Sequence, residues 1–580
     1  MTSSLRRPVD RLDESFDVAI VGGGITGICV AREAASRGLR VVLVERGDFG
    51  SGTSSATTKF IHGGIRYLEQ YDVAVVRESL RERRILALGA PHLVQQMQFV
   101  MPAWRWSKPA TPLLGAGVAL YHSLSFDRNR QAPPSLRIPT PRWLNRTELL
   151  SRVPWLDPDD LQGGFAYHDT LNVHPERLLL AYARSAAAAG AVLINHCEAS
   201  GFVVEDEGDT AFVRGVRVRD RLDDREYRIE ATVVVNAAGP WIEDVLRPLG
   251  RQLGVGVERS KGAHVLTRPL GGGTVTDAVL ARARSGRHVI VSPWMGKSFI
   301  GPTDTPMSPD DPVTCDPEDV EQILETVNST IGPTDEKLGV DDVELTTVGV
   351  RPLIKVDDPS DEVSPQDVSA DDTDTYSASR RHELYHHAER GVANVWTIGG
   401  GKWTTARATA EDMIDALFVH ELSHVREREF GSRTAPAHGT FSWAEDAEPF
   451  LVLAAHELVA AGVSERAAEI VVRAHGTDYR RILDLVVSEP TLARPIVGID
   501  EIAAQVVVAV VDESARTLAD VIDRRLIAGT TARIDDDTLH DVARVMAPLL
   551  GWSTEQADEA VDRERRRRSV IDTHWRTRRP

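Results

Sequence analysis

The sequence predicts an α/β fold whose main sheet is assembled from separate parts of the chain, followed by an all-α C-terminal domain. Three observations predict it. A β-α-β pattern lies near the N-terminus, two further apolar runs end in small residues far downstream, and helical periodicity takes over from about Phe441. We therefore expect residues 1–420 to hold the sheets and residues 421–580 to be helical.

The β-α-β pattern begins with the apolar run Phe16–Val21. A glycine turn follows, then a helical stretch, and then a second apolar run that ends at Glu45. The two later apolar runs are Val233–Gly239 and Val392–Gly401, and each is typical of a buried strand. Because these runs lie so far apart in the chain, the domain that contains them is predicted to be discontinuous.

Length and composition limit the functional classes. A chain of 580 residues is long enough for two or three domains, and 42% hydrophobic content is ordinary for a globular protein. The formal charge of −19 argues against nucleic-acid binding, because the overall field would repel a polyanion. The three cysteines are too few and too scattered for a disulfide framework or a metal cluster, which favours a reduced, cytoplasmic setting.

The glycine turn predicts a dinucleotide site. Gly22, Gly24 and Gly27 have the spacing that lets a chain turn tightly off a strand and bring backbone amides close to a pyrophosphate, which then faces a helix N-terminus. Glu45 lies 18 positions after Gly27, where a carboxylate can accept hydrogen bonds from ribose hydroxyls. This carboxylate disfavours the 2′-phosphate of NADP but does not separate FAD from NAD. The segment therefore predicts an ADP-containing cofactor.

A hydroxyl-rich stretch after the second apolar run distinguishes these cofactors. The residues from Gly52 to Glu69 read GTSSATTKFIHGGIRYLE. They suit a second loop wrapped around a diphosphate and a flavin, which a nicotinamide enzyme would not need. The candidate cofactor contacts in this stretch are Thr53, Ser54, Ser55, Lys59, His62, Gly63 and Gly64. The stretch resembles one in the FAD-dependent, quinone-linked glycerol-3-phosphate dehydrogenases, and the resemblance implies FAD as the cofactor.

The resemblance covers about 400 residues and extends into the helical domain. It continues in the same order through NAAGPW, KGAH, PWMGKSFIGPTDT, GVRPL, SRRH and GGGKWTTAR, which begin at residues 236, 261, 293, 349, 379 and 399. In the helical domain, DESARTLADVIDRRL is similar to the family's pattern. Pro302, Arg381 and Ala406 depart from that pattern, as does the length of an acidic stretch at 357–374. None of these departures removes a group that the chemistry requires.

The resemblance implies oxidation of a secondary alcohol, sn-glycerol 3-phosphate, to dihydroxyacetone phosphate by hydride transfer to FAD. The substrate phosphate is a dianion that prefers guanidinium partners in a dry site. By the family pattern, Arg351 and Arg380 are the first candidates to bind this phosphate. Arg66 and Tyr67 are carried over as helpers.

A base and a cation complete the implied catalytic set of His264, Arg351 and Lys402. His264 is the leading candidate to take the hydroxyl proton, His62 is the alternative, and Lys402 or Arg351 are further candidates. Lys402 follows three glycines and precedes a helical stretch, so its ammonium and the helix N-terminus would favour the reduced, anionic flavin. Lys402 is also expected to contact the substrate. The remaining predicted cofactor contacts are Ala238, Gly239 and Gly401.

The domain division follows from these runs. FAD-binding segments are expected at about 15–100, 165–260 and 390–420, and β-rich substrate-capping segments at about 101–164 and 261–389. The helical domain is expected at 421–580 with a basic tail. The acidic stretch at 357–374 has no apolar period and is predicted to be a solvated loop.

One motif points to a different chemistry. His420, Glu421 and His424 match H-E-x-x-H, a pattern that places two zinc ligands on one helix face. With 18 histidines in the chain such a match can arise by chance, and this one closes the helix after the flavin motif at a domain boundary. We therefore predict no metal site.

Membrane contact is predicted at the surface only. No stretch reaches the ~18 to 20 uncharged apolar residues that a spanning helix needs. The tail Arg563–Arg579 holds eight arginines with Trp575, which suits either lipid headgroups or a solvated tail. The apolar segment Pro112–Leu124 is a second candidate for the bilayer interface or a quinone entrance. Family members are peripheral on the cytoplasmic membrane and pass electrons to a quinone, which favours attachment; a homodimer rests on the family alone.

Two alternatives stay open. An oxidase that passes electrons to oxygen and releases hydrogen peroxide would share the fold and the substrate groups. A non-catalytic flavin-binding scaffold would share the cofactor site but would not need the second cationic site.

Overall fold

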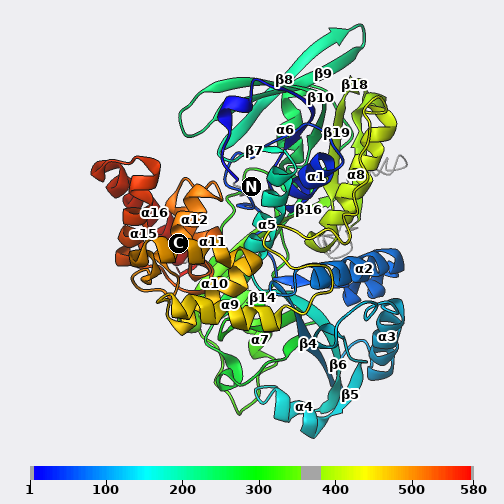
Figure 1. Ribbon diagram of the computed structural model, residues 1–580. Coiled ribbons are helices and arrows are strands. Elements are labelled where there is room, and N and C mark those ends of the chain that lie inside the picture. The colour runs from blue at the N-terminus through cyan, green and yellow to red at the C-terminus, as the bar shows by residue number, and fades with distance from the viewer. Residues whose placement is uncertain (1–4, 355–380, 577–580) are drawn as a thin grey trace.

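Two sheets and a helical domain make up the protein, as the computed structural model shows (Figure 1). The structure describes residues 5–354 and 381–576. Arg380 and the acidic stretch at 357–374 lie outside the described residues.

The first sheet has a parallel core in the order β19-β10-β1-β2-β7. These strands are β1 (Ser15–Val21), β2 (Val41–Val44), β7 (Val192–Ile194), β10 (Glu226–Asn236) and β19 (Val395–Gly400). In the register, Val21 lies beside Asn236 and Asn236 beside Thr397. The apolar runs near residues 16, 233 and 392 are thus confirmed as strands of one discontinuous sheet.

Helices cover one face of this sheet and further strands extend the other. α1 (Ile25–Ser36) packs against both α5 (Pro175–Ala188) and α8 (Ala406–His420). On the other side, β8 (Cys197–Glu207) and β9 (Thr210–Asp220) continue antiparallel from β10. Both faces are buried, which explains why the parallel strands read as continuous apolar runs rather than alternating ones.

The second sheet is mixed, with the order β15-β11-β14-β13-β12-β4-β6-β3, while β16 pairs with β11 and β5 with β6. Its strands are β3 (Phe60–Ile61), β4 (Val94–Trp104), β5 (Arg142–Asn145), β6 (Leu161–Asn172), β11 (Val257–Thr267), β12 (Ala278–Arg282), β13 (His288–Trp294), β14 (Lys297–Gly301), β15 (Thr305–Met307) and β16 (Val343–Ile354). Its helices are α2 (Val73–Gly89), α3 (Thr111–Leu124), α4 (Arg146–Arg152) and α7 (Pro317–Asn328). The α/β fold with a second, β-rich region is therefore confirmed.

The C-terminal region is helical, as predicted. Its main helices are α9 (Glu448–Ala460), α10 (Glu465–His475), α11 (Tyr479–Ser488), α12 (Ala503–Val511), α15 (Asp536–Leu550) and α16 (Thr554–Thr573). The long apolar stretch around α12 does not form one helix. It breaks after Val511, passes through Ser514 with φ +57°, and continues as α13 (Leu518–Asp520) and a π-helical turn, η12 (Val521–Arg525).

The basic tail differs from both expectations. Residues up to Thr573 belong to α16, where Arg567 and Arg568 form ion pairs with Asp523 and Glu564. Trp575 is 2% exposed and packs into the core of the second sheet. An interfacial aromatic and a solvated tail are therefore both wrong for residues 563–576, because this segment joins the C-terminal domain to the cap. Among the described residues, no helix combines the length and apolar character needed to cross a bilayer.

Candidate active site

A cavity of about 810 Å³ lies at the carboxyl ends of β1, β2 and β10. Gly22 has φ +112°, and a Cβ added there would lie 2.6 Å from the carbonyl oxygen of Ala237. A Cβ at Gly27 would lie 2.0 Å from the carbonyl oxygen of Gly22. Glycine is thus required at both positions because backbone, rather than side chain, occupies the space. Gly24 lines the same cavity.

Glu45 holds the turn and the following loop together. Its Oε2 accepts from the amide of Gly23 (2.6 Å) and its Oε1 from the amide of Gly47 (2.8 Å). The carboxylate lines the cavity wall, which is the position that a ribose-binding acid requires. Its contact with a ribose stays a prediction.

The predicted second loop also lines this cavity, and its hydroxyls have structural partners. Ser54 Oγ accepts from the amide of Ile25 (2.9 Å) at the start of α1, and Ser55 Oγ donates to the carbonyl of Gly50 (2.8 Å). Thr53 Oγ1 donates to the carbonyl of Val350 on β16 (2.7 Å). The loop therefore connects the helix N-terminus of the first sheet to the second sheet.

Lys59 is a buried cation in the same wall. Its φ is +59°, and its Nζ lies 3.9 Å from Glu176 Oε1 and 4.6 Å from the centre of the Trp294 ring. Ala238, Gly239 and Gly401 also line the cavity. His62 and Gly64 line a second cavity instead, and a Cβ at Gly63 would lie 2.3 Å from the Tyr121 hydroxyl, so that glycine permits close packing.

The second cavity, of about 940 Å³, adjoins the first. The two share the lining residues Thr53, Ala56, Thr57, Gly349, Pro352, Gly401, Lys402 and Trp403. Its wall also contains His62, Arg66, Tyr67, His264 and Arg351. The structure thus brings together the described candidates for substrate binding and catalysis, although they are spread over more than 300 positions of the chain.

Arg351 lies on β16 beside Ser260 of β11. Its Nη1 donates to Asp304 Oδ1 (3.0 Å) and to Ser260 Oγ (3.2 Å), and its Nη2 donates to the carbonyl of Thr303 (2.9 Å). A Cβ at Gly262 would lie 2.3 Å from Nη2, so the glycine of KGAH makes room for this guanidinium. Asp304 partly neutralises Arg351 and orients it.

Sequence reasoning did not single out Asp304 or Thr303. The signal was present, because both lie in the motif PWMGKSFIGPTDT. Only the pairing of β11 with β16 shows that this motif serves the arginine of GVRPL.

Lys402 stands where the two cavities meet. It follows Gly400 (φ +65°) and Gly401 (φ +86°) and precedes a short 3-10 turn that leads into α8. Its Nζ lies 3.7 Å from the centre of the Tyr67 ring and donates to Ser79 Oγ (3.3 Å). Lys402 thus lies four residues before the start of α8, and its action on a flavin or a substrate stays a prediction.

His264 is buried on β11 beside Thr347 of β16, and its ring stacks on Phe299 with the centroids 4.8 Å apart. Among the described residues, neither ring nitrogen has a hydrogen-bond partner, and neither does Thr347 Oγ1. Burial, together with Arg351 and Lys59, lowers the pKa of His264 to about 3. The imidazole is therefore neutral at pH 7 and can accept a proton. Because buried polar atoms nearly always have a hydrogen-bond partner in folded proteins, these atoms mark a candidate position for a bound group.

The H-E-x-x-H match does not form a zinc site. α8 ends at His420, so His424 does not lie on the same helix face. Glu421 accepts from Trp396 Nε1 (3.0 Å) and pairs with His386 (3.0 Å). Arg381, one of the departures from the family pattern, pairs with Asp72 (2.8 Å).

The first cavity fits an adenine dinucleotide that carries a flavin. At Gly22 and Gly27, backbone atoms occupy the space that a Cβ would need. The carboxylate of Glu45 follows the second strand, and the cations Lys59 and Lys402 line other parts of the wall. A helix N-terminus opens directly onto it.

Comparisons with known proteins agree with this geometry. The family model described as FAD dependent oxidoreductase matches residues 17–416, and the model described as C-terminal domain of alpha-glycerophosphate oxidase matches residues 398–557. A glycerol-3-phosphate dehydrogenase of Synechocystis is 31% identical over 564 residues, covering 95% of each chain. One of Mycobacterium leprae is 33% identical over 569 residues, covering 94% of this chain and 87% of that one.

A solved structure of similar fold is the glycerol-3-phosphate dehydrogenase from Bacillus halodurans complexed with FAD. Its TM-score is 0.76 with 24% identity, and the match covers 100% of both chains. This structure shows the fold, while the family models and the relatives confirm the resemblance inferred from the motifs and FAD as the cofactor. The chain belongs to the FAD-dependent oxidoreductases, and within them to the FAD-dependent glycerol-3-phosphate dehydrogenase family.

Proposed function

We propose that the protein oxidises sn-glycerol 3-phosphate to dihydroxyacetone phosphate and passes the electrons to a membrane quinone. One observation carries the proposal. Arg66, Arg351 and Lys402 come from three distant segments and line one cavity, and Lys402 lies where that cavity meets the FAD cavity. The names of the relatives support the same substrate.

The cations suit a phosphate dianion next to the flavin site. Lys402 is a point charge at the junction, and Arg66 lies on the turn η2 (Ile65–Gln70) in the same wall. Arg351 is held by Asp304, so it is preorganised and binds without a large loss of side-chain entropy. Arg380, the other candidate for the phosphate, lies outside the described residues and stays part of the proposal.

His264 is the proposed acceptor of the hydroxyl proton. When bound, FAD supplies the hydride acceptor for the C2 hydrogen. The proton of the C2 hydroxyl passes to a ring nitrogen of His264 as the carbonyl forms, so the substrate loses two electrons and two hydrogens in all. Burial is the main cause of the lowered pKa of His264, and a bound phosphate dianion would offset only the lesser causes, the charges of Arg351 and Lys59. His62 remains the alternative base.

Membrane attachment is proposed through α3. This helix contains no Asp, Glu, Lys or Arg, and it exposes Leu113 (65%) and Leu120 (44%). Phe126, just beyond its end, is 74% exposed. An uncharged helix with outward apolar side chains suits the interface of a bilayer, where a quinone is available. On this basis we propose attachment to the membrane surface, while the cytoplasmic face and a homodimer are proposed from the family alone.

Vesicle co-sedimentation tests this attachment. Replacing Leu113, Leu120 and Phe126 by serine should release the protein from vesicles that contain anionic lipid. The matched control replaces Val452 and Leu453 of α9, which are also exposed, by serine. Equal binding by the α3 variant and the wild type would exclude α3 as the attachment surface.

The substrate assignment is tested by anaerobic reduction. Adding sn-glycerol 3-phosphate to the FAD-loaded protein should bleach the visible absorbance of the flavin, and the enantiomer sn-glycerol 1-phosphate should bleach it far more slowly. Failure of both to bleach the flavin would favour a non-catalytic flavin protein.

The second candidate is an oxidase, because the model matched by the C-terminal domain is described by that activity. The quantity that separates the two functions is the ratio of quinone-analogue reduction to hydrogen peroxide release during turnover. Hydrogen peroxide released in proportion to the product would mean that oxygen, rather than a quinone, accepts the electrons.

A further inference from the structure

The loop after β2 is connected to the C-terminal domain by a buried ionic cluster. Asp48, in this loop, is fully buried. It accepts hydrogen bonds from Arg524 Nε (2.5 Å) and from both terminal nitrogens of Arg525, one of them at 3.0 Å. Asn195 Nδ2 bridges Asp48 Oδ1 (2.9 Å) and the carbonyl of Ser514 (2.9 Å). The side-chain amide of Asn195 thus joins the carboxylate of Asp48 to a backbone carbonyl of the C-terminal domain.

The local structure of the C-terminal domain presents both arginines together. They end the π-helical turn η12, and such turns are rare and frequently occur at functional sites. Arg524 also donates to Asp520 Oδ1 (2.8 Å), and Arg525 to the carbonyl of Glu513 (2.7 Å). Asp520 and Glu513, both in the C-terminal domain, therefore hold the two guanidinium groups in the orientation that contacts Asp48.

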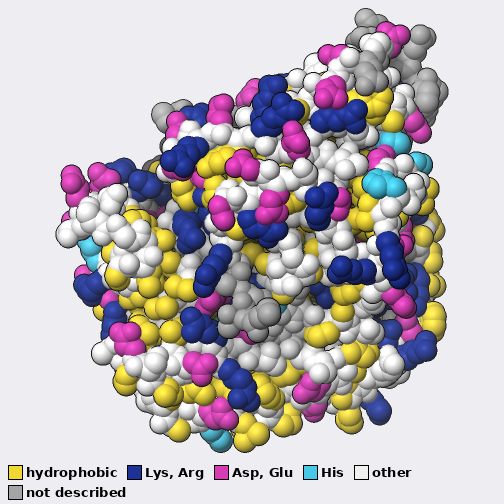
Figure 2. Space-filling model, turned by 45° about the horizontal axis from the view of Figure 1, so that its top comes forward, with side chains coloured by type: hydrophobic (Ala, Val, Ile, Leu, Met, Phe, Trp, Pro, Cys, Tyr) yellow, Lys and Arg dark blue, Asp and Glu magenta, His cyan; other side chains and the backbone are white. Residues whose placement is uncertain are grey.

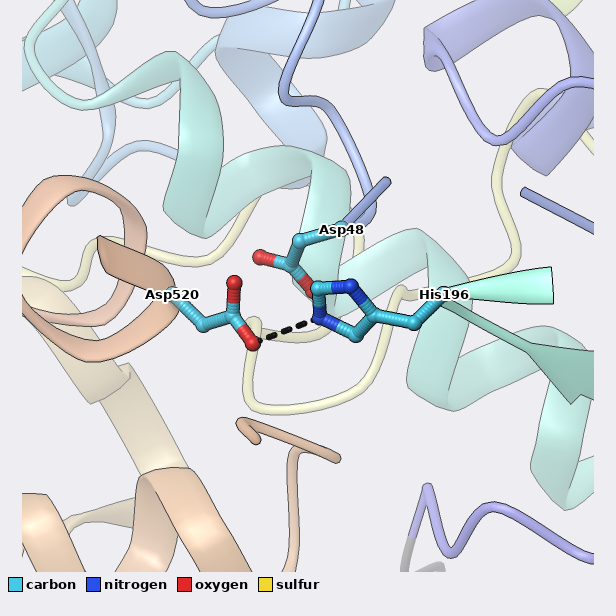
Figure 3. A group of neighbouring side chains, drawn as sticks. All are labelled: Asp48, His196 and Asp520. Atoms are coloured by element: carbon cyan, nitrogen blue, oxygen red, sulfur yellow. Dashed lines mark hydrogen bonds and ion pairs between the residues drawn. The ribbon is translucent and has the colours of Figure 1, made fainter. Parts of the chain in front are cut away.

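This cluster is an ionic clamp rather than a metal site. Asp48, His196 and Asp520 offer ligand atoms within 4.8 Å of one another, and Figure 3 shows the two carboxylates around the imidazole, whose Nε2 lies 2.8 Å from Asp520. Each carboxylate already pairs with arginine. A divalent cation there would be repelled by both guanidinium groups.

The Asp48 loop supports the cofactor turn directly. Within it, the amide of Gly47 donates to Glu45 Oε1 (2.8 Å), and the amide of Gly50 donates to the carbonyl of Gly23 (2.9 Å). The amide of Ser51 donates to the carbonyl of Asp48 (3.0 Å) and closes the loop on itself. A displacement of Asp48 would therefore move both the acid and the glycine turn of the FAD cavity.

The C-terminal domain also forms part of the cavity wall. Arg524 and Thr530 line the FAD cavity, as do Arg568, Ile571 and His574 of the segment that includes α16. His574 pairs with Asp316 (3.0 Å), at the start of α7 in the cap. The domain thus contacts both sides of the cavity.

We propose that the C-terminal helical domain is a component of the FAD site, and that Arg525 and Asn195 are positioning residues that hold the Asp48 loop in the shape that binds FAD. The domain would then control how tightly FAD is retained. This inference rests on the FAD family alone and is independent of the proposed substrate and electron acceptor.

The test is the dissociation constant of FAD, measured by flavin fluorescence on the full-length apoprotein. Arg525→Met should raise it about 10-fold or more, which corresponds to about 1.4 kcal/mol. Asn195→Ala should raise it in the same direction by a smaller factor. The thermal midpoint of each apoprotein, measured alongside, separates loss of affinity from loss of folded protein.

The matched control is Arg177→Met. Arg177, on α5, forms a buried ion pair with Glu513 of the C-terminal domain (2.7 Å). This pair also joins the C-terminal domain to the helices of the first sheet, but its acid is Glu513 rather than Asp48. The substitution should lower the thermal midpoint and leave the dissociation constant within about twofold of the wild type. The proposal is overturned if Arg525→Met binds FAD as the wild type does, or if Arg177→Met weakens FAD equally. If Arg525→Met does not fold, a wild-type constant for Asn195→Ala overturns it.

Discussion

The dinucleotide turn takes its glycines and its carboxylate from 24 consecutive residues, 22–45, whereas the cationic wall of the neighbouring cavity consists of Arg66, Arg351 and Lys402, which are far apart in the chain. In the turn, backbone atoms exclude side chains, so the glycines are required for steric reasons. In the cationic wall, charged groups are oriented by partners on other strands, as Arg351 is by Asp304. The turn should therefore respond to added volume, and the wall to lost charge or lost orientation.

Surface charge shows a third pattern. On the face seen in Figure 2, Lys and Arg side chains are interspersed with Asp and Glu side chains. The cations proposed to bind an anionic substrate line the second cavity instead. A net charge of −19 is thus compatible with a local site for a dianion.

Removing the charge at the junction should have the largest effect. Lys402→Met should lower turnover about 10²- to 10³-fold, because a preorganised cation beside the reacting groups is lost. FAD occupancy, measured from the visible absorbance of the purified protein, should stay close to the wild type. The control is Lys297→Met, whose lysine pairs with Glu344 away from the junction. Unaltered turnover of Lys402→Met would remove Lys402 from the mechanism.

Adding one methyl group to the turn should act on the cofactor. Gly27→Ala places a Cβ 2.0 Å from a backbone oxygen, so the turn must shift at a cost of about 1–3 kcal/mol. FAD affinity should fall about 5- to 150-fold, as measured by flavin fluorescence. Gly89→Ala is the control, since a Cβ there meets nothing within 4 Å. Normal FAD affinity in Gly27→Ala would contradict the steric account of the turn.

A glycine-to-alanine substitution in the cationic wall should change the binding of the substrate rather than that of FAD. A Cβ at Gly262 would lie 2.3 Å from Arg351 Nη2, which is a movable side-chain atom. Gly262→Ala should therefore raise KM for sn-glycerol 3-phosphate about tenfold with unchanged FAD affinity. Weaker FAD binding without a change in KM would break the contrast between turn and wall.

The buried imidazole predicts an effect on stability, with no change required in cofactor or substrate binding. The pKa of His264 in the folded protein is about 3, below the value of about 6.5 expected when unfolded. The contribution of the neutral His264 to the free energy of unfolding is present above pH 6.5. It is lost as the pH falls towards 3, because the unfolded chain binds the proton at a higher pH than the folded protein does. Between pH 6.5 and 4, the unfolding free energy of the apoprotein should fall more steeply than that of His264→Asn, by up to ~1.4 kcal/mol per pH unit. Parallel denaturation curves across this range would show that His264 is not held neutral.

Much of this molecule was predictable from local pattern. The β-α-β unit, the helical C-terminal region and the strands at 233 and 392 all follow from apolar periodicity and glycine spacing, because these signals depend on neighbouring residues. The tail was predicted wrongly for the same reason. Its composition suggested lipid or solvent, but Trp575 packs in the cap, and the acids that pair with its arginines include Asp523, about 40 positions away.

By itself, the sequence determined the cofactor turn and the fold class, and it supplied the candidates for the groups that the chemistry needs. Tertiary structure decided which of those groups meet. The partnership of Arg351 with Asp304 and the clamp of Arg525 on Asp48 depend on strand register and domain packing, as does the lack of a partner for the His264 nitrogens within the described part of the chain. The physical reason is range: steric rules act between chain neighbours, whereas the partners of a buried charge are set by whichever segments the folded core brings within hydrogen-bonding distance.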